Sequence, residues 1–298
     1  MSYNPFPNSF MSYFAAVREK YTSVSLFQTL SWVGVVFAMA LINLHPILAQ
    51  DEPPPLPLHG IEGSGGIFST YSAYLVNPAK EDQIFGLPSV AGFFVHLGQG
   101  RSLETVSITE TLWDRLEIGY AWNGFDLGDL PEAVWKATGA QLGDDYVNLH
   151  NFNARVALIK ENDFDQSWVP AVTAGVHYKY NDTIDSLDDD LAGTLSGYVG
   201  IENNDGVDFT LYASKMLTFL PRPVLINAGL RATEAAHLGL LGFTDEYEVV
   251  FEGNVAVFVT DQFILSSEFR QKPDNYTRIP GLIEDENDWF TILAAYVI

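Results

Sequence analysis

Apolar and polar side chains alternate along residues 247–270 with the period of a β-strand. Apolar or small residues share one parity: Tyr247, Val249, Phe251, Gly253, Val255, Val257 and Val259. Glu248, Glu252 and Asn254 occupy the other parity. After residues 260–262 the alternation restarts, with Phe263, Leu265, Ser267 and Phe269 opposite Ser266, Glu268 and Arg270. Successive side chains of a strand point to opposite faces, so this stretch predicts a hairpin with one apolar and one polar face.

The turn also predicts the register of the hairpin. A three-residue loop at 260–262 pairs Val257 with Leu265, Val255 with Ser267, Asn254 with Glu268, and Glu252 with Arg270. Glu252 and Arg270 then form a cross-strand ion pair on the polar face. A two-residue loop would shift the pairing by one position and bring one of these charges to the apolar face.

The same pattern recurs along the chain and predicts about twelve strands. The predicted strands cover residues 67–76, 91–97, 104–110, 115–122, 151–158, 172–180, 191–202, 207–213, 224–233, 247–259, 263–270 and 289–298. Long strands with charges on the covered face are typical of outer-membrane barrels, where lipid lies outside and water inside. The predicted fold is therefore an all-β, antiparallel transmembrane (outer-membrane) β-barrel of about 12 strands. A soluble β-sandwich is the alternative.

The N-terminal region predicts export. An apolar segment of about 15 residues, 30–44, is shorter than the ~20 that a transmembrane helix needs. It follows Arg18 and Lys20 and ends before an acidic, proline-rich start at Asp51, which is the layout of a secretory signal peptide. We expect residues 1–50 to be the signal peptide, with an uncleaved anchor as the alternative. Residues 51–65 would be a Pro/Gly-rich arm and residues 66–298 the barrel, located in the bacterial outer membrane.

Charge and cysteine content narrow the function. Without residues 1–50, which hold Arg18, Glu19 and Lys20, the chain has 13 basic and 37 acidic side chains, a net charge of −24. Binding to nucleic acid needs a basic surface, so we expect no nucleic-acid partner. The chain has no cysteine, so its stability cannot come from disulfides and must come from a continuous hydrogen-bonded sheet.

Two connections between predicted strands have distinctive composition. Residues 124–145 combine Asp129, Pro131 and Gly139 in the pattern of a short helix with an acidic start and a glycine stop, which could plug a barrel end. Residues 181–190 hold five aspartates without the spacing of a calcium loop. We expect a solvated acidic loop there, with divalent-cation binding as the alternative.

Several short strings resemble an uncharacterised bacterial family catalogued as domain of unknown function 3034. They are residues 53–59, 74–78 (YLVNP), 173–182 (TAGVHYKYND), 206–210 (GVDFT), 240–243 (LLGF), 251–254 (FEGN) and 269–274 (FRQKPD). The resemblance implies a Gram-negative outer-membrane protein and implies no activity. Members continue for about two more strands and end in an aromatic residue, whereas this sequence stops at Ile298. It is either a truncated larger barrel or a barrel that closes with fewer strands.

The sequence offers little catalytic chemistry. Its histidines are scattered, and it has no His-Glu-x-x-His motif, no cysteine and no Gly-x-Ser-x-Gly elbow. We therefore predict no catalytic, cofactor-binding or metal-binding residues and no cofactor. Ser69 and His96 are the one pair considered for a lipid-cleaving site at the rim.

The best candidates for a functional site are polar residues predicted to face the lumen. They are Glu252, Arg270, Glu248, Asn254, Glu268, Arg231, Asn227, Arg155, Glu117, Arg115, His177 and Lys179. They could line a small cation-preferring porin or channel, or they could form a network that fills the lumen of a structural barrel. A rim-located lipid-modifying enzyme is the third hypothesis. The expected partners are outer-membrane lipid, the outer-membrane assembly machinery, and small solutes or cations.

Overall fold

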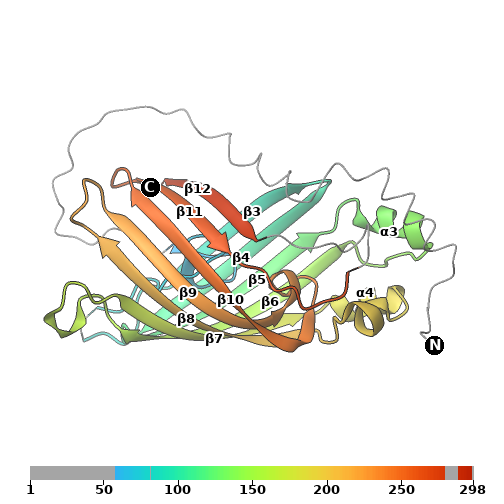
Figure 1. The fold of residues 1–298 in the computed structure, drawn as a ribbon, viewed down its shortest axis with the longest axis horizontal. Helices are drawn as coiled ribbons and strands as arrows, with labels where there is room; N and C mark the ends of the chain where they lie inside the picture. Colours follow the sequence, from blue (N-terminus) through green and yellow to red (C-terminus); the bar gives the residue numbers. More distant parts are fainter. Residues whose placement is uncertain (1–57, 81, 279–287, 297–298) are drawn as a thin grey trace.

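The computed structural model describes residues 58–80, 82–278 and 288–296, and its main element is one antiparallel sheet of ten strands (Figure 1). The strands are β3 (Ser89–Gly98), β4 (Arg101–Leu112), β5 (Leu116–Asp126), β6 (Tyr146–Ile159), β7 (Ala171–Asn181), β8 (Asp205–Leu217), β9 (Val224–Ala235), β10 (Phe243–Phe258), β11 (Phe263–Arg270) and β12 (Trp289–Tyr296). Each strand pairs with its neighbour in the chain, so the sheet is a simple meander. The all-β, antiparallel prediction is confirmed.

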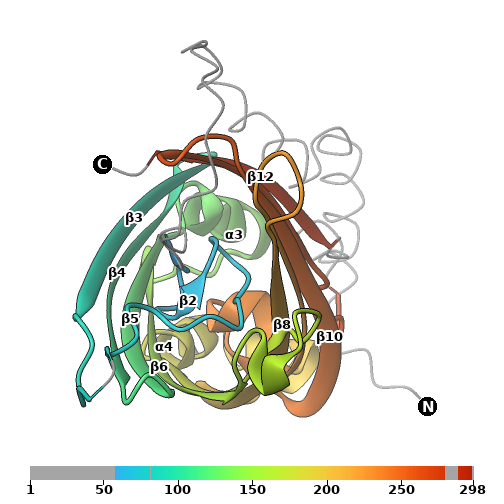
Figure 2. The ribbon, with the colours of Figure 1, turned by 90° about the vertical axis from the view of Figure 1, so that its left-hand side faces the viewer.

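The sheet is strongly curled, and the first described residues lie inside the curl (Figure 2). Two short strands, β1 (Leu58–His59) and β2 (Gly65–Gly66), pair with each other there and form a separate small sheet. The edges of the large sheet are β3 and β12, and among the described residues no ladder of hydrogen bonds joins them. The large sheet thus holds ten strands where the sequence pattern predicted about twelve for the barrel.

Residues 67–76, predicted as the first strand, do not form one. They are enclosed by the sheet, and Gly66 makes a single bridge to Tyr71. Several of their backbone N–H groups do not pair with a neighbouring strand. Those of Phe68, Ser69 and Thr70 donate to the carboxylate of Glu268, which lies on β11 of the sheet. Their apolar content reflects burial on all sides.

Residues 191–202, predicted as another strand, form a short π-helical turn, Leu195–Val199. Gly200 ends this turn with a φ of 88°, a conformation that favours glycine and that an extended strand does not contain. Val199 and Ile201 are buried in an apolar cluster with Leu127 and Val147. The apolar side chains that suggested a strand therefore cover one end of the sheet.

The predicted helix is confirmed as α3 (Leu130–Thr138). Pro131 lies in its first turn, and Gly139 ends it in the left-handed conformation while donating its N–H to the Trp135 carbonyl. Shorter helical turns are Asp163–Asp165 and Ala236–Gly239.

The predicted acidic loop is instead a second helix, α4 (Ile184–Asp190), at the same end of the molecule as α3 (Figure 1). Ile184 and Leu187 anchor it by burial. Its acidic side chains bind nearby polar groups: Asp188 accepts from the Leu195 N–H (2.7 Å) and Asp190 from the Gly143 N–H (2.6 Å). The described residues contain no group of three His, Cys, Asp or Glu side chains placed to hold a metal ion.

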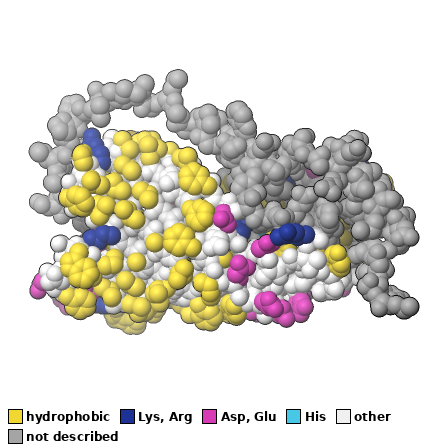
Figure 3. Space-filling view, in the orientation of Figure 1, with side chains coloured by type: hydrophobic (Ala, Val, Ile, Leu, Met, Phe, Trp, Pro, Cys, Tyr) yellow, Lys and Arg dark blue, Asp and Glu magenta, His cyan; other side chains and the backbone are white. Residues whose placement is uncertain are grey.

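The two faces of the sheet differ as the alternation predicts. Large apolar residues are exposed along the outer face, and Figure 3 shows them over much of its visible surface. They include Val106, Ile108, Ile118, Phe152, Val176, Phe209, Leu211, Ile226, Leu230, Val249, Phe251 and Phe269. The hairpin register is confirmed, with Val257 paired to Leu265, Asn254 to Glu268, and Glu252 to Arg270.

In the described part of the chain, no helix has the length and apolar character needed to cross a membrane. The predicted signal peptide, 1–50, and residues 51–57 of the predicted arm lie outside the described residues.

Gly229 on β9 gives a first test of packing against the inner face. It lies opposite Tyr212 of β8, and a Cβ added at Gly229 would stand 2.2 Å from the Tyr212 ring. We expect Gly229→Ala to lower the free energy of unfolding by about 1–3 kcal/mol, the usual cost of overpacking. Gly92→Ala is the matched control, because a Cβ on this strand glycine would meet only the Thr105 carbonyl oxygen at 3.7 Å. Denaturant titration measures both, and equal midpoints would contradict the packing.

Candidate functional site

The candidate site lies where residues 58–80, called here the internal segment, meet the inner face of the sheet. The segment folds on itself through backbone bonds such as Gly60 N–H to Ser64 O (2.8 Å) and Ile61 N–H to Phe68 O (2.8 Å). Buried polar groups need hydrogen-bond partners. Many partners of this segment are side chains on the inner face of the ten-stranded sheet, which is called here the wall. The contacts fall into three groups, one of them centred on Glu62.

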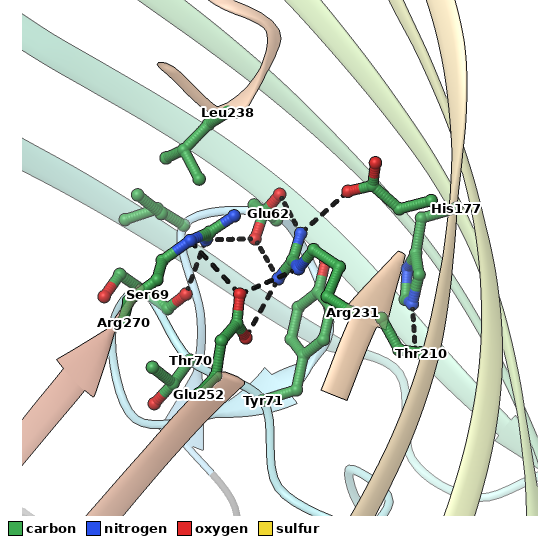
Figure 4. Close-up of polar contacts among 12 residues, drawn as sticks. Glu62, Ser69, Thr70, Tyr71, His177, Thr210, Arg231, Leu238, Glu252 and Arg270 are labelled. Carbon is green, nitrogen blue, oxygen red and sulfur yellow. Dashed lines mark hydrogen bonds and ion pairs between the residues drawn. The ribbon is translucent and has the colours of Figure 1, made fainter. Parts of the chain in front are cut away.

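Glu62 is the carboxylate around which the central cluster forms (Figure 4). Arg231 of β9 binds both of its oxygens, with Nη1 3.0 Å from Oε1 and Nη2 2.9 Å from Oε2. Arg270 of β11 places Nη1 3.3 Å from Oε2, and Lys179 of β7 donates to Oε1. The side chains of all four residues are at most 5% exposed, so these are buried ion pairs.

Two wall carboxylates complete the central cluster. Asp208 of β8 lies 2.9 Å from both Lys179 Nζ and Arg231 Nη1. Glu252 of β10 lies 2.8 Å from Arg231 Nε and 3.1 Å from Arg270 Nε, and it also accepts the Tyr212 hydroxyl. Cations and carboxylates thus alternate across neighbouring strands, which is the arrangement that offsets the cost of burying charge.

Burial by itself raises the pKa of the Glu62 carboxyl, but the nearby Arg231, Lys179 and Arg270 lower it more strongly. The net result is a pKa well below the usual range, so Glu62 is held as the charged form. The charge of Glu62 therefore stabilises the folded protein fully above the pKa of an unfolded glutamate. This stabilisation is lost as the pH falls through the lowered pKa of Glu62 in the folded protein.

A second group of charges binds the backbone of the internal segment. Arg155 of β6 pairs with Glu117 of β5 (2.9 Å) and donates to the carbonyl oxygens of Gly65, Ser72 and Tyr74 at 2.8–2.9 Å. Glu117 accepts from the N–H groups of Gly65 (3.2 Å) and Val76 (2.7 Å). This ion pair therefore satisfies both donors and acceptors of an irregular chain.

Glu268 of β11 forms the third group and binds one turn of the internal segment through hydrogen bonds. It accepts the N–H groups of Phe68 (2.9 Å), Ser69 (3.2 Å) and Thr70 (3.1 Å) and the hydroxyls of Ser69 and Thr70. Neighbouring Asn254 of β10 donates to the Thr70 hydroxyl at 2.8 Å. Hydrogen bonds to a carboxylate are among the stronger ones, so this turn is tightly held.

Tyr71 links the charges to the aromatic side chains of the interior. Its ring lies beneath the Arg231 guanidinium, 4.7 Å from the centroid, and stacks on His177 with centroids 4.7 Å apart. His177 in turn contacts Asn153 (2.7 Å) and Thr210 (2.9 Å). A cation over an aromatic face adds stabilisation where water is excluded.

The structure places most of the predicted site residues on this inner face. Glu252, Arg270, Asn254, Glu268, Arg231, Asn227, Arg155, Glu117, His177 and Lys179 are all buried. Arg115 and Glu248 are not part of the network. Arg115 is exposed in the β4–β5 turn, next to the Ala157 carbonyl, and Glu248 accepts the Asp274 N–H (2.9 Å) after a register shift in β10. Alternation fixes the face of a side chain only in the regular body of a strand.

Two important residues were not among the sequence candidates. Asp208 shares the parity of Thr210 and Tyr212, so the alternation contained its signal. Glu62 lies in a glycine-rich stretch without alternation, so the sequence contained no signal for its position. Ser69 and His96, the candidate pair for lipid cleavage, do not contact each other. Ser69 is buried against Glu268, whereas His96 is exposed on β3.

Comparison with models of known protein families identifies the family of this chain. A family model described as a protein of unknown function (DUF3034) matches residues 58–298. The chain belongs to this family. The DUF3034 match includes the internal segment together with every strand of the curled sheet. No match was found among curated proteins or among solved structures.

Proposed function

We propose that this DUF3034 protein is an outer-membrane β-barrel whose lumen is filled by its own internal segment, and that in this state it is a closed structural barrel and not an open pore. The observation that carries the proposal is the position of residues 59–76 inside the curled sheet, bound through Glu62, Arg155 and Glu268. A porin needs a water-filled passage along its wall. Here the charged wall residues bind protein instead.

The outer face supports a membrane location. Exposed apolar side chains on a continuous sheet are costly in water and are the normal surface of a barrel in lipid. Exposed aromatic residues lie near both strand ends, such as Trp113 and Trp168 at one end and Tyr180 at the other. From residue 171 to residue 180 a strand rises ~30 Å, or ~23 Å along the barrel axis at a tilt of about 40°. That height fits the apolar band of about 25 Å seen in such barrels.

The connections support one orientation. At one end the connections are residues 113–115, 160–170, 218–223 and 259–262. At the other end residues 99–100 form a tight turn, but residues 127–145 and 182–204 make much longer connections that contain α3 and α4. Outer-membrane barrels have short periplasmic turns and longer loops outside the cell. We therefore assign α3, α4 and their acidic side chains to the cell surface.

The lumen charges favour the filled barrel over the cation-preferring porin. The buried wall carries equal numbers of cations and carboxylates: Arg155, Lys179, Arg231 and Arg270 against Glu117, Asp208, Glu252 and Glu268. The acidic surplus of the chain is therefore not concentrated on this part of the wall, and several aspartates lie on α4 instead. A cation filter would need a surplus of negative charge along an open lumen.

Conductance in planar lipid bilayers tests the proposal. The purified full chain should insert, resist denaturation unless boiled, and show no steady conductance. Glu268→Ala removes the carboxylate that holds residues 68–70, and it should give intermittent conductance as the internal segment loosens. Glu104→Ala is the control, because Glu104 is exposed and contacts Tyr146 instead of the internal segment. Steady conductance of the unmodified protein, or its recovery in the soluble periplasm, would contradict the proposal.

A further inference from the structure

Lys179, Arg231 and Arg270 converge on one carboxylate that does not belong to the wall. Arg231 presents two N–H groups side by side to the two oxygens of Glu62, at 3.0 and 2.9 Å. This fork is the geometry by which arginine recognises planar carboxylates. Lys179 of β7 binds Oε1 of Glu62 and Arg270 of β11 binds Oε2, from strands on either side of β9. Figure 4 shows Arg231 and Arg270 meeting at Glu62. The cations are therefore arranged as a receptor for a carboxylate.

The wall and its occupant are structurally separate. The three cations belong to β7, β9 and β11 of the large sheet, whereas Glu62 lies between β1 and β2, which form a separate two-stranded sheet. Glu62 meets Arg231 and Arg270 across 169 and 208 positions of sequence. Withdrawal of the internal segment would leave the cations in place on their strands.

The charge count shows what the vacated wall would bind. Besides Glu62, the three cations contact two carboxyl groups of the wall, Asp208 and Glu252. Without Glu62, three cations face two carboxylates, so one positive charge on this part of the wall has no partner. One monoanion restores neutrality. A dianion such as sulfate would bring a second negative charge towards Asp208 and Glu252.

We propose that Lys179, Arg231 and Arg270 form a binding site for a carboxylate-bearing solute in the barrel wall, with Glu62 as the built-in occupant. The site accepts such a solute when Glu62 is withdrawn. This inference rests on the proposed function in one respect, since the filled lumen is the space that the solute would enter. It adds a ligand class, a monoanionic carboxylate, and the residues that recognise it.

Acetate rescue of Glu62→Ala tests the site directly. The substitution removes Cγ and the carboxyl group of Glu62, which together have the heavy atoms of acetate. In detergent micelles, the denaturant midpoint of Glu62→Ala should fall well below that of the unmodified protein and then rise with acetate until it saturates. Sulfate also stabilises folded proteins in general, so each salt is compared at the same ionic strength on the variant and on the unmodified protein. Acetate should raise the midpoint of Glu62→Ala more than that of the unmodified protein, whereas sulfate and chloride should shift the two midpoints equally.

Asn254→Ala is the matched control, because Asn254 is buried in the same interior and contacts Thr70 but no cation of the site. Acetate should not restore its midpoint. If Glu62→Ala does not fold in chloride, the refolding yield replaces the midpoint, and equal yields in acetate and chloride overturn the inference. An equal response of both variants to acetate also overturns it. The micelle assay needs neither conductance nor outer-membrane location, so failure of the proposed function would be seen separately.

Discussion

Arg231→Ala should lower the free energy of unfolding by about 3–5 kcal/mol, the cost of breaking a buried ion pair from one side. Arg231 is fully buried and binds three carboxylates, those of Glu62, Asp208 and Glu252. Without the guanidinium these groups face one another with only Lys179 and Arg270 to compensate them. Urea titration of the refolded protein in micelles measures the loss, and the boiling-dependent shift on gels gives a second reading.

Two variants separate charge from geometry in this result. Arg231→Lys keeps the charge but loses the two-pronged contact with Glu62, so its midpoint should fall between those of Arg231→Ala and the unmodified protein. Arg115→Ala should change stability by less than about 0.5 kcal/mol, because Arg115 is exposed and outside the network. Equal midpoints for Arg231→Ala and Arg115→Ala would show that the buried cluster does not stabilise the fold.

Leu211→Arg should cost about 2–4 kcal/mol when the protein folds into lipid vesicles, the range for an arginine at the middle of the bilayer. Leu211 lies in the central part of β8, between Ala174 of β7 and Leu230 of β9, and its side chain is 49% exposed on the outer face. On a protein surface in water, the same substitution at such an exposed position would change stability by about 0.5 kcal/mol or less. The size of the effect therefore reports what surrounds the sheet.

Asp189→Arg controls for the added arginine itself. Asp189 is exposed on α4, at the end of the molecule that we assign to the cell surface. Its substitution should leave the free energy of folding into vesicles nearly unchanged. Similar values for Leu211→Arg and Asp189→Arg would mean that the outer face of β8 does not contact lipid.

The sequence by itself determined the faces and pairing of the strands. In a strand between two different environments, the apolar and polar side chains alternate with a period of two residues. Val255, Val257 and Leu265 therefore marked one face, and Glu252 and Arg270 marked the other. Equal parity and a short turn then allowed one register, which the structure shows. Pro131 and Gly139 likewise predicted α3, because their backbone preferences act locally.

Only the tertiary structure decided what fills the curled sheet. Residues 67–76 are enclosed on all sides and so have no alternation that could distinguish them from a buried strand. The role of Glu62 depends on Arg231 and Arg270, which are 169 and 208 positions away. The predicted count of about twelve strands was not confirmed, and the sheet has ten. The reason is the same, because strand pairing depends on hydrogen-bond partners and not on apolar content. Local periodicity reports the environment of a segment, whereas contacts over long sequence separations decide which part of the chain provides that environment.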